Sequence, residues 1–503
     1  MWAVASEGVG ADSVSRNAAF AVVTRLTTAA ITAVVAIFLG RRLGPQVYGY
    51  FALAMSIGTV CAFLADLGIT SGTPRFIAER RHNRAAVSAV VGDAMRLKAF
   101  AAVPVSVLLF ALAGPITNAF DTPGAEWPLR GIAIAVLAQG FFMFVLATFE
   151  AVGRIAINLR VVALESVIEG TSIVALVLLG AGATGAAFGR AIGYTVGAGI
   201  ALGFLLRVVG RPRSGAGDVS GLRPRDIARY AGALLVVDAL FRAFAQIDVL
   251  LIGAILGGGR AIGLFDLPMQ LAWFLHYPAG AVSSAVAPRL ARSPGSEPQI
   301  GTFMDAMRWI TALQGIFLAP ILIWAEPIMT TLLGDEYRES GEVLRALTPF
   351  ILLSGPALLV SGTVNYLGAA RKRVPFAIAA LAVNAAFDAI FLPRMGIVAG
   401  AIGTNLAYAI WVPAHIVIVH QLLGVPLRPL VLNFVYAAFA AGVACLPLLA
   451  LGTDPGVVIL VLGTALACLV YVATLRLTGG VGPADIERMR EIVGRRIGWM
   501  APR

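Results

Sequence analysis

The chain has 503 residues, of which 59% are hydrophobic and only 13% are charged, and its mean hydropathy is +0.87. A soluble protein carries about 25% charged residues, so this composition excludes a surface that is mostly exposed to water. The formal net charge of +11 lies mostly on arginines in short segments between apolar runs, which favours a membrane protein and argues against nucleic-acid binding.

Apolar runs of roughly 20 residues recur along the whole chain, and this length is typical of transmembrane helices. Because the backbone must satisfy its own hydrogen bonds in lipid, we predict an all-α polytopic membrane protein with about fourteen transmembrane helices. In chain order the predicted spans are 17–40, 46–70, 87–114, 129–150, 160–181, 184–206, 227–253, 260–286, 303–333, 342–367, 374–393, 397–420, 429–451 and 456–477.

The segments between the predicted spans differ in their content of Lys and Arg. Those on one side of the membrane carry 25 of these residues, and those on the other side carry seven. Since cytoplasmic loops are enriched in Lys and Arg, we predict a multi-pass protein of the inner membrane, surrounded by membrane lipids, with both termini in the cytoplasm.

The two halves of the sequence match at an offset of about 214 residues. The clearest run pairs Gly49, Phe51, Leu53 and Met55 with Gly263, Phe265, Leu267 and Met269. Each copy would hold six spans, an even number, so the two copies would share one orientation. Parallel repeats of this kind are typical of transporters.

The repeat predicts two parallel six-helix lobes, over residues 1–206 and 227–420. A Gly-, Pro- and Arg-rich cytoplasmic linker at 207–226 would join them. Two additional helices at 429–477 lie outside the repeat, and residues 478–503 form a basic cytoplasmic tail.

Cations inside the predicted spans are candidate substrate-binding residues, because a charge in the bilayer core is costly unless it faces protein or a wet cavity. Arg25 on the first span and Arg242 on the seventh occupy related places in the two repeats. Arginine binds phosphate groups through paired hydrogen bonds, so we predict that both face a central cavity and bind a polyanionic headgroup. The alternative for Arg242 is an ion pair with Asp238, four residues away.

The candidate coupling or cavity acids are Asp66, Glu165, Glu169, Asp238, Asp248 and Asp388. Buried carboxyl groups can bind a proton, so H+ or Na+ is the coupling ion considered. For Asp66 we favour a structural ion pair, with Arg75 close in sequence. For Glu165, Glu169 and Asp388, hydrogen bonding to neighbouring helices is an equal alternative.

Other ionisable residues in the spans have simpler explanations. We expect Arg96, Lys98 and Arg308 to reach the nearby cytoplasmic surface with their long side chains. We expect His276 and His415 to be packing residues with one satisfied ring nitrogen. No phosphate-binding Gly-rich loop, Cys/His metal spacing or nucleophile elbow occurs in the sequence, so we expect neither an enzyme nor a metal or cofactor.

Short motifs stand at the ends of several predicted spans. They are Leu39–Pro45 with Tyr48–Phe51, Asp66–Ile69 with Pro74–Ala78, Asp248–Gly253 with Gly263–Phe265, Gly334–Tyr337, and Arg394–Ile397 with Gly400–Ala401. In this order they resemble the Wzx-type oligosaccharide flippases of the multidrug/oligosaccharidyl-lipid/polysaccharide exporter (MOP) superfamily. The resemblance implies a V-shaped pair of lobes with alternating access, and a substrate that is a sugar chain on a polyprenyl diphosphate.

We therefore predict a flippase that translocates a lipid-linked oligosaccharide for surface polysaccharide biosynthesis, with the polysaccharide polymerase machinery as a further partner. A drug/cation antiporter and a flippase for the peptidoglycan lipid precursor, both on the same fold, are the alternatives. A non-transporting scaffold is a third class. An antiporter for cationic drugs would have a cavity dominated by acids, whereas binding of a phosphate lipid needs arginines.

Overall fold

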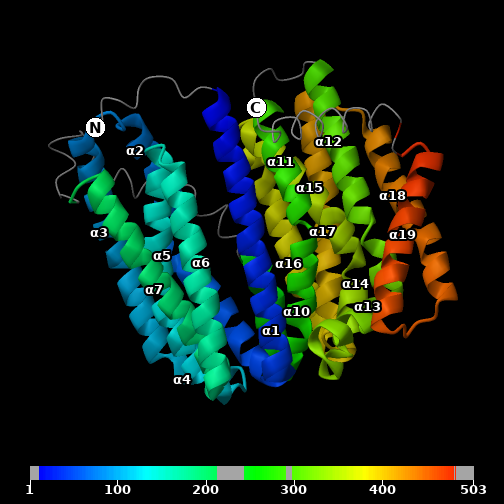
Figure 1. Ribbon diagram of the computed structural model, residues 1–503, viewed down its shortest axis with the longest axis horizontal. Coiled ribbons are helices and arrows are strands. Elements are labelled where there is room, and N and C mark those ends of the chain that lie inside the picture. The colour runs from blue at the N-terminus through cyan, green and yellow to red at the C-terminus, as the bar shows by residue number, and fades with distance from the viewer. Residues whose placement is uncertain (1–10, 212–242, 291–296, 481, 483–503) are drawn as a thin grey trace, which may run out of the picture. The chain divides into compact units, whose positions relative to one another are not determined.

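The computed structural model describes residues 11–211, 243–290, 297–480 and 482, and every regular element in these ranges is helical (Figure 1). The prediction of an all-α protein is thereby confirmed. Ten stretches within the described residues are long and apolar enough to cross a membrane. The total of fourteen spans stays a prediction.

The chain divides into two compact units. The first comprises Met1–Leu267 with Ala385–Gly400, and the second comprises Pro268–Asn384 with Ala401–Arg503. The helices of the first unit are α1 (Ala11–Asp66), α2 (Ile69–Glu79), α3 (Arg84–Ala111), α4 (Ala113–Ala119), η2 (Pro123–Ala125), α5 (Glu126–Ala151), α6 (Ile155–Leu176), η3 (Val177–Ala181), α7 (Gly182–Val208) and the helix Ala243–Leu256. The lobe boundaries at 1–206 and 227–420 stay predictions.

Three helices run from one unit into the other, namely α10 (Gly259–Leu275), α16 (Val374–Met395) and α17 (Val398–Leu423). The second unit further holds α11 (Tyr277–Leu290), α12 (Glu297–Gly315), α13 (Leu318–Leu333), η4 (Asp335–Tyr337), α14 (Ser340–Ala346), α15 (Thr348–Tyr366), η5 (Ala370–Arg373), α18 (Leu427–Ala450) and α19 (Val457–Leu477). Most of the predicted linker and tail lies outside the described residues.

Helices α18 and α19, the pair that follows the sequence repeat, are anchored to the second unit. They pack on each other and on α13. The indole N–H of Trp324 on α13 donates to the carbonyl of Gly452, at 2.8 Å, in the turn between α18 and α19. The hydroxyl of Tyr471 on α19 donates to the carbonyl of Ala312 on α12, also at 2.8 Å. These buried hydrogen bonds attach the added pair to the bundle at two places.

Glycines with positive φ break the helices where turns were predicted. Gly44 has φ 67° and interrupts α1, with Pro45 directly after it, so the first two predicted spans form one helical stretch with a break. Gly180 and Gly182, with φ of 89° and 55°, separate α6 from α7. Only glycine adopts such angles without a Cβ clash, which explains why these turns could be read from the sequence.

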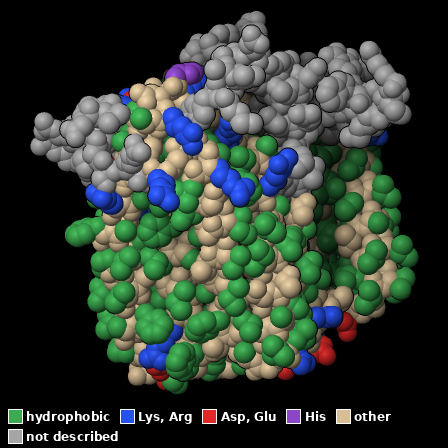
Figure 2. Space-filling model, turned by 60° about the vertical axis from the view of Figure 1, so that its left-hand side comes forward, with side chains coloured by type: hydrophobic (Ala, Val, Ile, Leu, Met, Phe, Trp, Pro, Cys, Tyr) green, Lys and Arg blue, Asp and Glu red, His purple; other side chains and the backbone are tan. Residues whose placement is uncertain are grey.

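The outer surface is apolar over a wide band. On the face drawn in Figure 2, hydrophobic side chains fill the middle and Lys and Arg side chains lie along the borders. Leu477, Leu179 and Phe100 are 89%, 82% and 80% exposed. Exposed apolar surface of this extent would aggregate in water, and it is what a lipid bilayer covers.

Two segments related by the sequence repeat cross at very short distance within the first unit. A Cβ atom on Gly49 of α1 would lie 1.7 Å from the carbonyl oxygen of Gly259. A Cβ atom on Gly263 of α10 would lie 2.0 Å from a backbone oxygen of α1. Beside this glycine crossing, the Tyr48 hydroxyl donates to Asp266 at 2.7 Å. The crossing is a contact between main chains, which no side chain at positions 49 or 263 would permit.

Candidate functional site

The predicted substrate-binding cations are not part of the described site. Arg25 lies on α1, but its side chain lies outside the described residues, as do Arg242 and Asp238 altogether. The pairing of two guanidinium groups in a central cavity therefore stays a prediction. The five other predicted acids are described, and they lie in three separate places.

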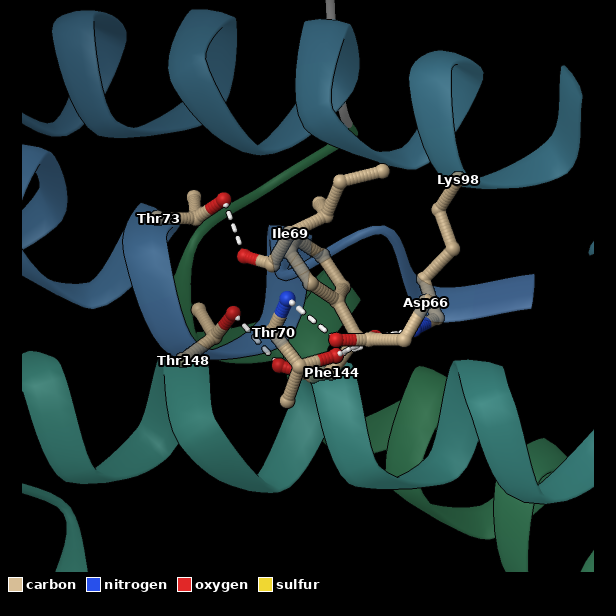
Figure 3. Close-up of polar contacts among 7 residues, drawn as sticks. All are labelled: Asp66, Ile69, Thr70, Thr73, Lys98, Phe144 and Thr148. Atoms are coloured by element: carbon tan, nitrogen blue, oxygen red, sulfur yellow. Dashed lines mark hydrogen bonds and ion pairs between the residues drawn. The ribbon is translucent and has the colours of Figure 1, made fainter. Parts of the chain in front are cut away.

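The first place joins α1, α2 and α3 around Asp66, the last residue of α1 (Figure 3). The helix ends there because Leu67 and Gly68 have positive φ, at 48° and 73°. The Asp66 carboxylate accepts hydrogen bonds from the backbone N–H and the hydroxyl of Thr70 and from the ammonium of Lys98. Lys98 also donates to the Thr70 hydroxyl at 2.9 Å. Three helices thus share one charged hydrogen-bond network.

The position of Lys98 corrects two expectations. The side chain is 1% exposed and does not extend to the membrane surface, because the carboxylate of Asp66 lies next to it inside the bundle. Asp66 pairs with Lys98 rather than with Arg75, which forms an ion pair with Glu79 at 3.1 Å. A buried charge is retained at low cost only when it is paired and hydrogen-bonded, as here. The geometry favours a structural role for Asp66, at the break between α1 and α2.

The second place lies between α6 and α7 and contains Glu165 and Glu169. Arg190 of α7 forms an ion pair with Glu169 and donates to the Tyr194 hydroxyl at 3.2 Å. Its guanidinium carbon also lies 4.9 Å from the centre of the Tyr194 ring. The sequence shows Arg190 as a cation within a span but gives no sign of its partner, which lies 21 residues earlier on another helix.

The third place lies in the first unit, where Asp248 of the helix Ala243–Leu256 faces Asp388 of α16. The side chains are 7% and 0% exposed. No donor among the described residues reaches either carboxylate oxygen of Asp388. Asp248 and Asp388 interact electrostatically, and two ionised carboxylates that are buried next to each other repel. This carboxyl pair can therefore hold one proton or one small cation between its oxygens.

A buried polar cluster in the second unit was missed by the sequence analysis. Arg373 Nε donates to His415 Nε2 at 3.1 Å, and Arg373 Nη1 donates to the Asn365 side chain at 2.5 Å. His415 Nδ1 lies 2.8 Å from the carbonyl oxygen of Trp411. A carbonyl only accepts, so His415 carries its proton on Nδ1 and is neutral. Both ring nitrogens are satisfied, where one was expected, and Arg373 is buried although its segment was predicted to be a cytoplasmic loop.

None of these places is a metal centre of the usual kind. Among the described residues, no group of three or more His, Cys, Asp or Glu side chains could hold a metal ion. What the ionisable groups offer instead is an ion pair, a pair of acids with one arginine, and a pair of acids next to each other.

Residues 14–293, more than half of the chain, match the family described as polysaccharide biosynthesis protein. The chain belongs to this family. The resemblance to Wzx-type flippases noted in the sequence is confirmed by this match and by the solved structures that share the fold. A search of curated proteins found no match.

This polysaccharide biosynthesis protein is similar in fold to several transporters. It matches the lipid II flippase MurJ in an inward closed conformation with a TM-score of 0.72 and 12% identity, over 90% of this chain and 97% of that one. It matches a multidrug resistance MATE family transporter of the MOP superfamily, in an inward-facing conformation, with a TM-score of 0.64 and 16% identity, over 84% of this chain and 98% of that one. It also matches a MOP superfamily transporter from Pyrococcus furiosus with a TM-score of 0.54 and 14% identity, over 85% of this chain and 95% of that one. The chain is a multi-pass membrane protein with the MOP transporter fold.

Proposed function

We propose that this protein flips a polyprenyl-diphosphate-linked oligosaccharide across the inner membrane by alternating access, for surface polysaccharide biosynthesis. The observation that carries the proposal is the match of residues 14–293 to a polysaccharide biosynthesis family within a chain whose fold resembles a lipid II flippase. The charge bias of the loops supports cytoplasmic termini. The substrate then meets the protein at the cytoplasmic leaflet and leaves it on the opposite side.

In this proposal Arg25 and Arg242 bind the diphosphate. Moving a multivalent anion through a low-dielectric bilayer needs compensating charge along the route. Guanidinium groups supply it without changing protonation and bind phosphate oxygens through two parallel hydrogen bonds. The sequence repeat supports a pair of such cations, because both stand on the first helix of their copy.

The carboxyl pair of Asp248 and Asp388 is the proposed place for a coupling ion. Two ionised carboxylates at hydrogen-bond distance repel each other strongly when they are buried, so the pair favours one bound proton or monovalent cation. Binding or release of that ion changes the packing of α16 against the helix Ala243–Leu256. A gradient of the ion can thereby drive one direction of transport.

The glycine crossing gives alternating access a mechanical basis. While Gly49 contacts the main chain of α10 and Gly263 contacts the main chain of α1, no substrate passes between these helices at this end of the first unit. Opening requires these segments to separate, which breaks the hydrogen bond between Tyr48 and Asp266.

The proposal is tested in a strain that lacks this protein. Lipid-linked oligosaccharide is expected to accumulate on the inner leaflet of that strain, and the wild-type chain is expected to restore export. The Arg25→Ala/Arg242→Ala variant should fail to restore export at normal protein levels. A matched control is Arg130→Ala, since Arg130 forms an ion pair with Glu126 within the first turns of α5, at 2.7 Å.

Four outcomes would contradict the proposal. Full export by the double variant would show that the two arginines do not bind the substrate, and unchanged export in the null strain would indicate a scaffold. Accumulation of the peptidoglycan precursor would move the substrate to that lipid. Loss of resistance to cationic drugs, with normal polysaccharide, would favour an antiporter, the function suggested by the acidic pair of Asp248 and Asp388.

A further inference from the structure

The contact between α6 and α7 is unusually close and brings two acids against glycines. A Cβ atom on Gly189 would lie 2.6 Å from the backbone of Ile173. One on Gly193 would lie 2.7 Å from Glu169 Cα, and one on Gly197 would lie 2.7 Å from Glu165 Cγ. The three glycines are spaced four residues apart, so they line one face of α7. This glycine face lets the stems of both glutamates pack directly against α7.

The two glutamates differ in what their carboxyl groups contact. Glu169 is in an ion pair with Arg190, whose Nη2 donates to the Tyr194 hydroxyl. Gln139 of α5 also donates to that hydroxyl, at 3.3 Å. The positive charge of Arg190 is thus directed at Glu169 and fixed by Tyr194. Glu165 is left as the second acid beside a single cation.

Glu165 is buried without a strong partner. Its side chain is 4% exposed, and Oε1 has no hydrogen-bond partner among the described residues. Oε2 lies 3.5 Å from the Ser166 hydroxyl, at the limit of a hydrogen bond. An ionised carboxylate in this position would be costly, because a buried charge needs pairing and hydrogen bonds. A protonated carboxyl group is compatible with the same surroundings.

The surroundings of Glu165 hold few other charges. The titratable and charged groups that face it are Glu169 on its own helix and Arg190 and Tyr194 on α7. From α5, the ring of Phe142 lies beside Gly197 at the same level. From α1, Ile31 and Val35 contact α6 next to Gly170. The side chain of Arg25, further along α1, lies outside the described residues.

A bound metal cation fits this place poorly. Within the described part of the chain there is no cluster of three acidic, His or Cys side chains. Arg190 already supplies a positive charge, and it would repel a second cation at this distance. A proton needs only one carboxylate oxygen and places no added charge beside Arg190, since it neutralises Glu165.

We propose that Glu165 is a proton-binding site of the N-terminal half, and that Arg190, which is paired with Glu169, is the counter-charge available to its carboxylate. While Glu165 is protonated it is neutral, so Arg190 stays in its ion pair with Glu169. Release of the proton to water yields a carboxylate that competes with Glu169 for Arg190 and so alters the packing of α6 on α7. The assignment of this exchange to a transport cycle rests on the proposed function, whereas the proton site itself does not.

The test is infrared spectroscopy of the full-length protein in lipid nanodiscs. A protonated carboxyl group has a C=O stretching band that disappears when the proton is released at rising pH. We expect such a band in the wild type and its specific loss in Glu165→Gln. The matched control is Glu126→Gln, because Glu126 is also paired with an arginine but is partly exposed. A band of unchanged size in Glu165→Gln overturns the proposal.

Two further measurements check the role of Arg190 and the nature of the bound ion. In Glu169→Gln, Arg190 becomes available to Glu165, so the band should disappear at lower pH than in the wild type; an unmoved midpoint contradicts the proposed counter-charge. The band should also be the same with sodium or choline as the cation. Its loss on addition of sodium at constant pH would show a metal site instead and overturn the proton assignment.

Failure of this inference and failure of the proposed function give different results. If the wild-type chain does not restore polysaccharide export in the null strain, the flippase function is wrong, although the band still reports on Glu165. If export is restored but the band is unaffected in Glu165→Gln, only the proton site is wrong.

Discussion

The two buried acid clusters of the first unit differ in the groups that surround their acids. Between α6 and α7, Arg190 is paired with Glu169, and Glu165 is the second acid beside it. Beside α16, Asp248 and Asp388 face each other, and no described donor reaches the Asp388 oxygens. In the first cluster an arginine of the same unit pairs with one of the two acids, whereas the second cluster consists of two adjacent acids. This difference predicts different responses to substitution, because losing a cation exposes a buried charge and losing an acid removes a repulsion.

The largest effect is expected at the built-in cation. Arg190→Met leaves Glu169 without its partner, and breaking a buried ion pair costs about 3–5 kcal/mol, toward the lower end here because Arg190 is 21% exposed. The free energy of unfolding in mixed micelles measures it. The double variant Arg190→Met/Glu169→Gln should recover most of the loss. Equal destabilisation of both variants would show that packing, not charge, is responsible.

A smaller effect is expected from the glycine face that holds the acids. Gly193→Ala places a methyl group within 2.7 Å of Glu169, and overpacking of this kind costs about 1–3 kcal/mol. The control is Gly199→Ala on the same helix, where nothing lies within 4 Å of the new Cβ atom. That control should stabilise α7 by up to about 1 kcal/mol through helix propensity. If both variants behaved alike, the close approach of α6 and α7 would be wrong.

A substitution in the carboxyl pair of Asp248 and Asp388 should change the free energy of unfolding only slightly, and it can raise it rather than lower it. Asp388→Asn removes one of two adjacent acids, so the free energy of unfolding should change by less than about 1 kcal/mol or rise. Export should nevertheless fall, because the amide cannot bind and release the coupling ion. Asp335→Asn, a change at an exposed acid of η4, is the control for export. A loss of stability as large as that in Arg190→Met would show that Asp388 has a fixed cationic partner.

The smallest effect is expected at a partly exposed ion pair. Glu126→Gln disrupts the contact with Arg130, four residues later on α5, and such pairs contribute about 0.3–0.5 kcal/mol. Unfolding of this variant should be nearly that of the wild type. If Glu126→Gln lowered the free energy of unfolding by more than Gly193→Ala does, charge at the start of α5 would matter more to stability than close packing between α6 and α7. The expected order of effects would then be reversed.

The sequence predicted the helices well and the partners of their charges poorly. Apolar length alone places a span, and glycines such as Gly44 or Gly180 mark turns through their own backbone freedom, so these features are local. The pairing of Asp66 with Lys98 joins positions 32 residues apart and depends on how α3 packs, which no pattern in the sequence encodes. Arg75 is close to Asp66 in the sequence, but it pairs with Glu79 in the structure.

The same distinction applies to the candidate site. Glu165, Glu169, Asp248 and Asp388 could be named because an acid in an apolar run is conspicuous. Which of them carries a counter-charge could not be read from the sequence, since Arg190 lies on a different helix from the acid it neutralises. The buried state of Arg373 was missed because a basic run in a short segment also fits an ordinary cytoplasmic loop.

The glycine crossing also explains a property of the sequence repeat. Inserting or deleting one residue of α1 near Gly49 would rotate the helix by about 100° and turn the glycine away from α10. The register between the two copies is therefore held by their own contact, and the best-matched run in the sequence, from Gly49 and from Gly263, lies at that contact. The predicted repeat is therefore clearest in a run of residues that the packing of α1 on α10 requires.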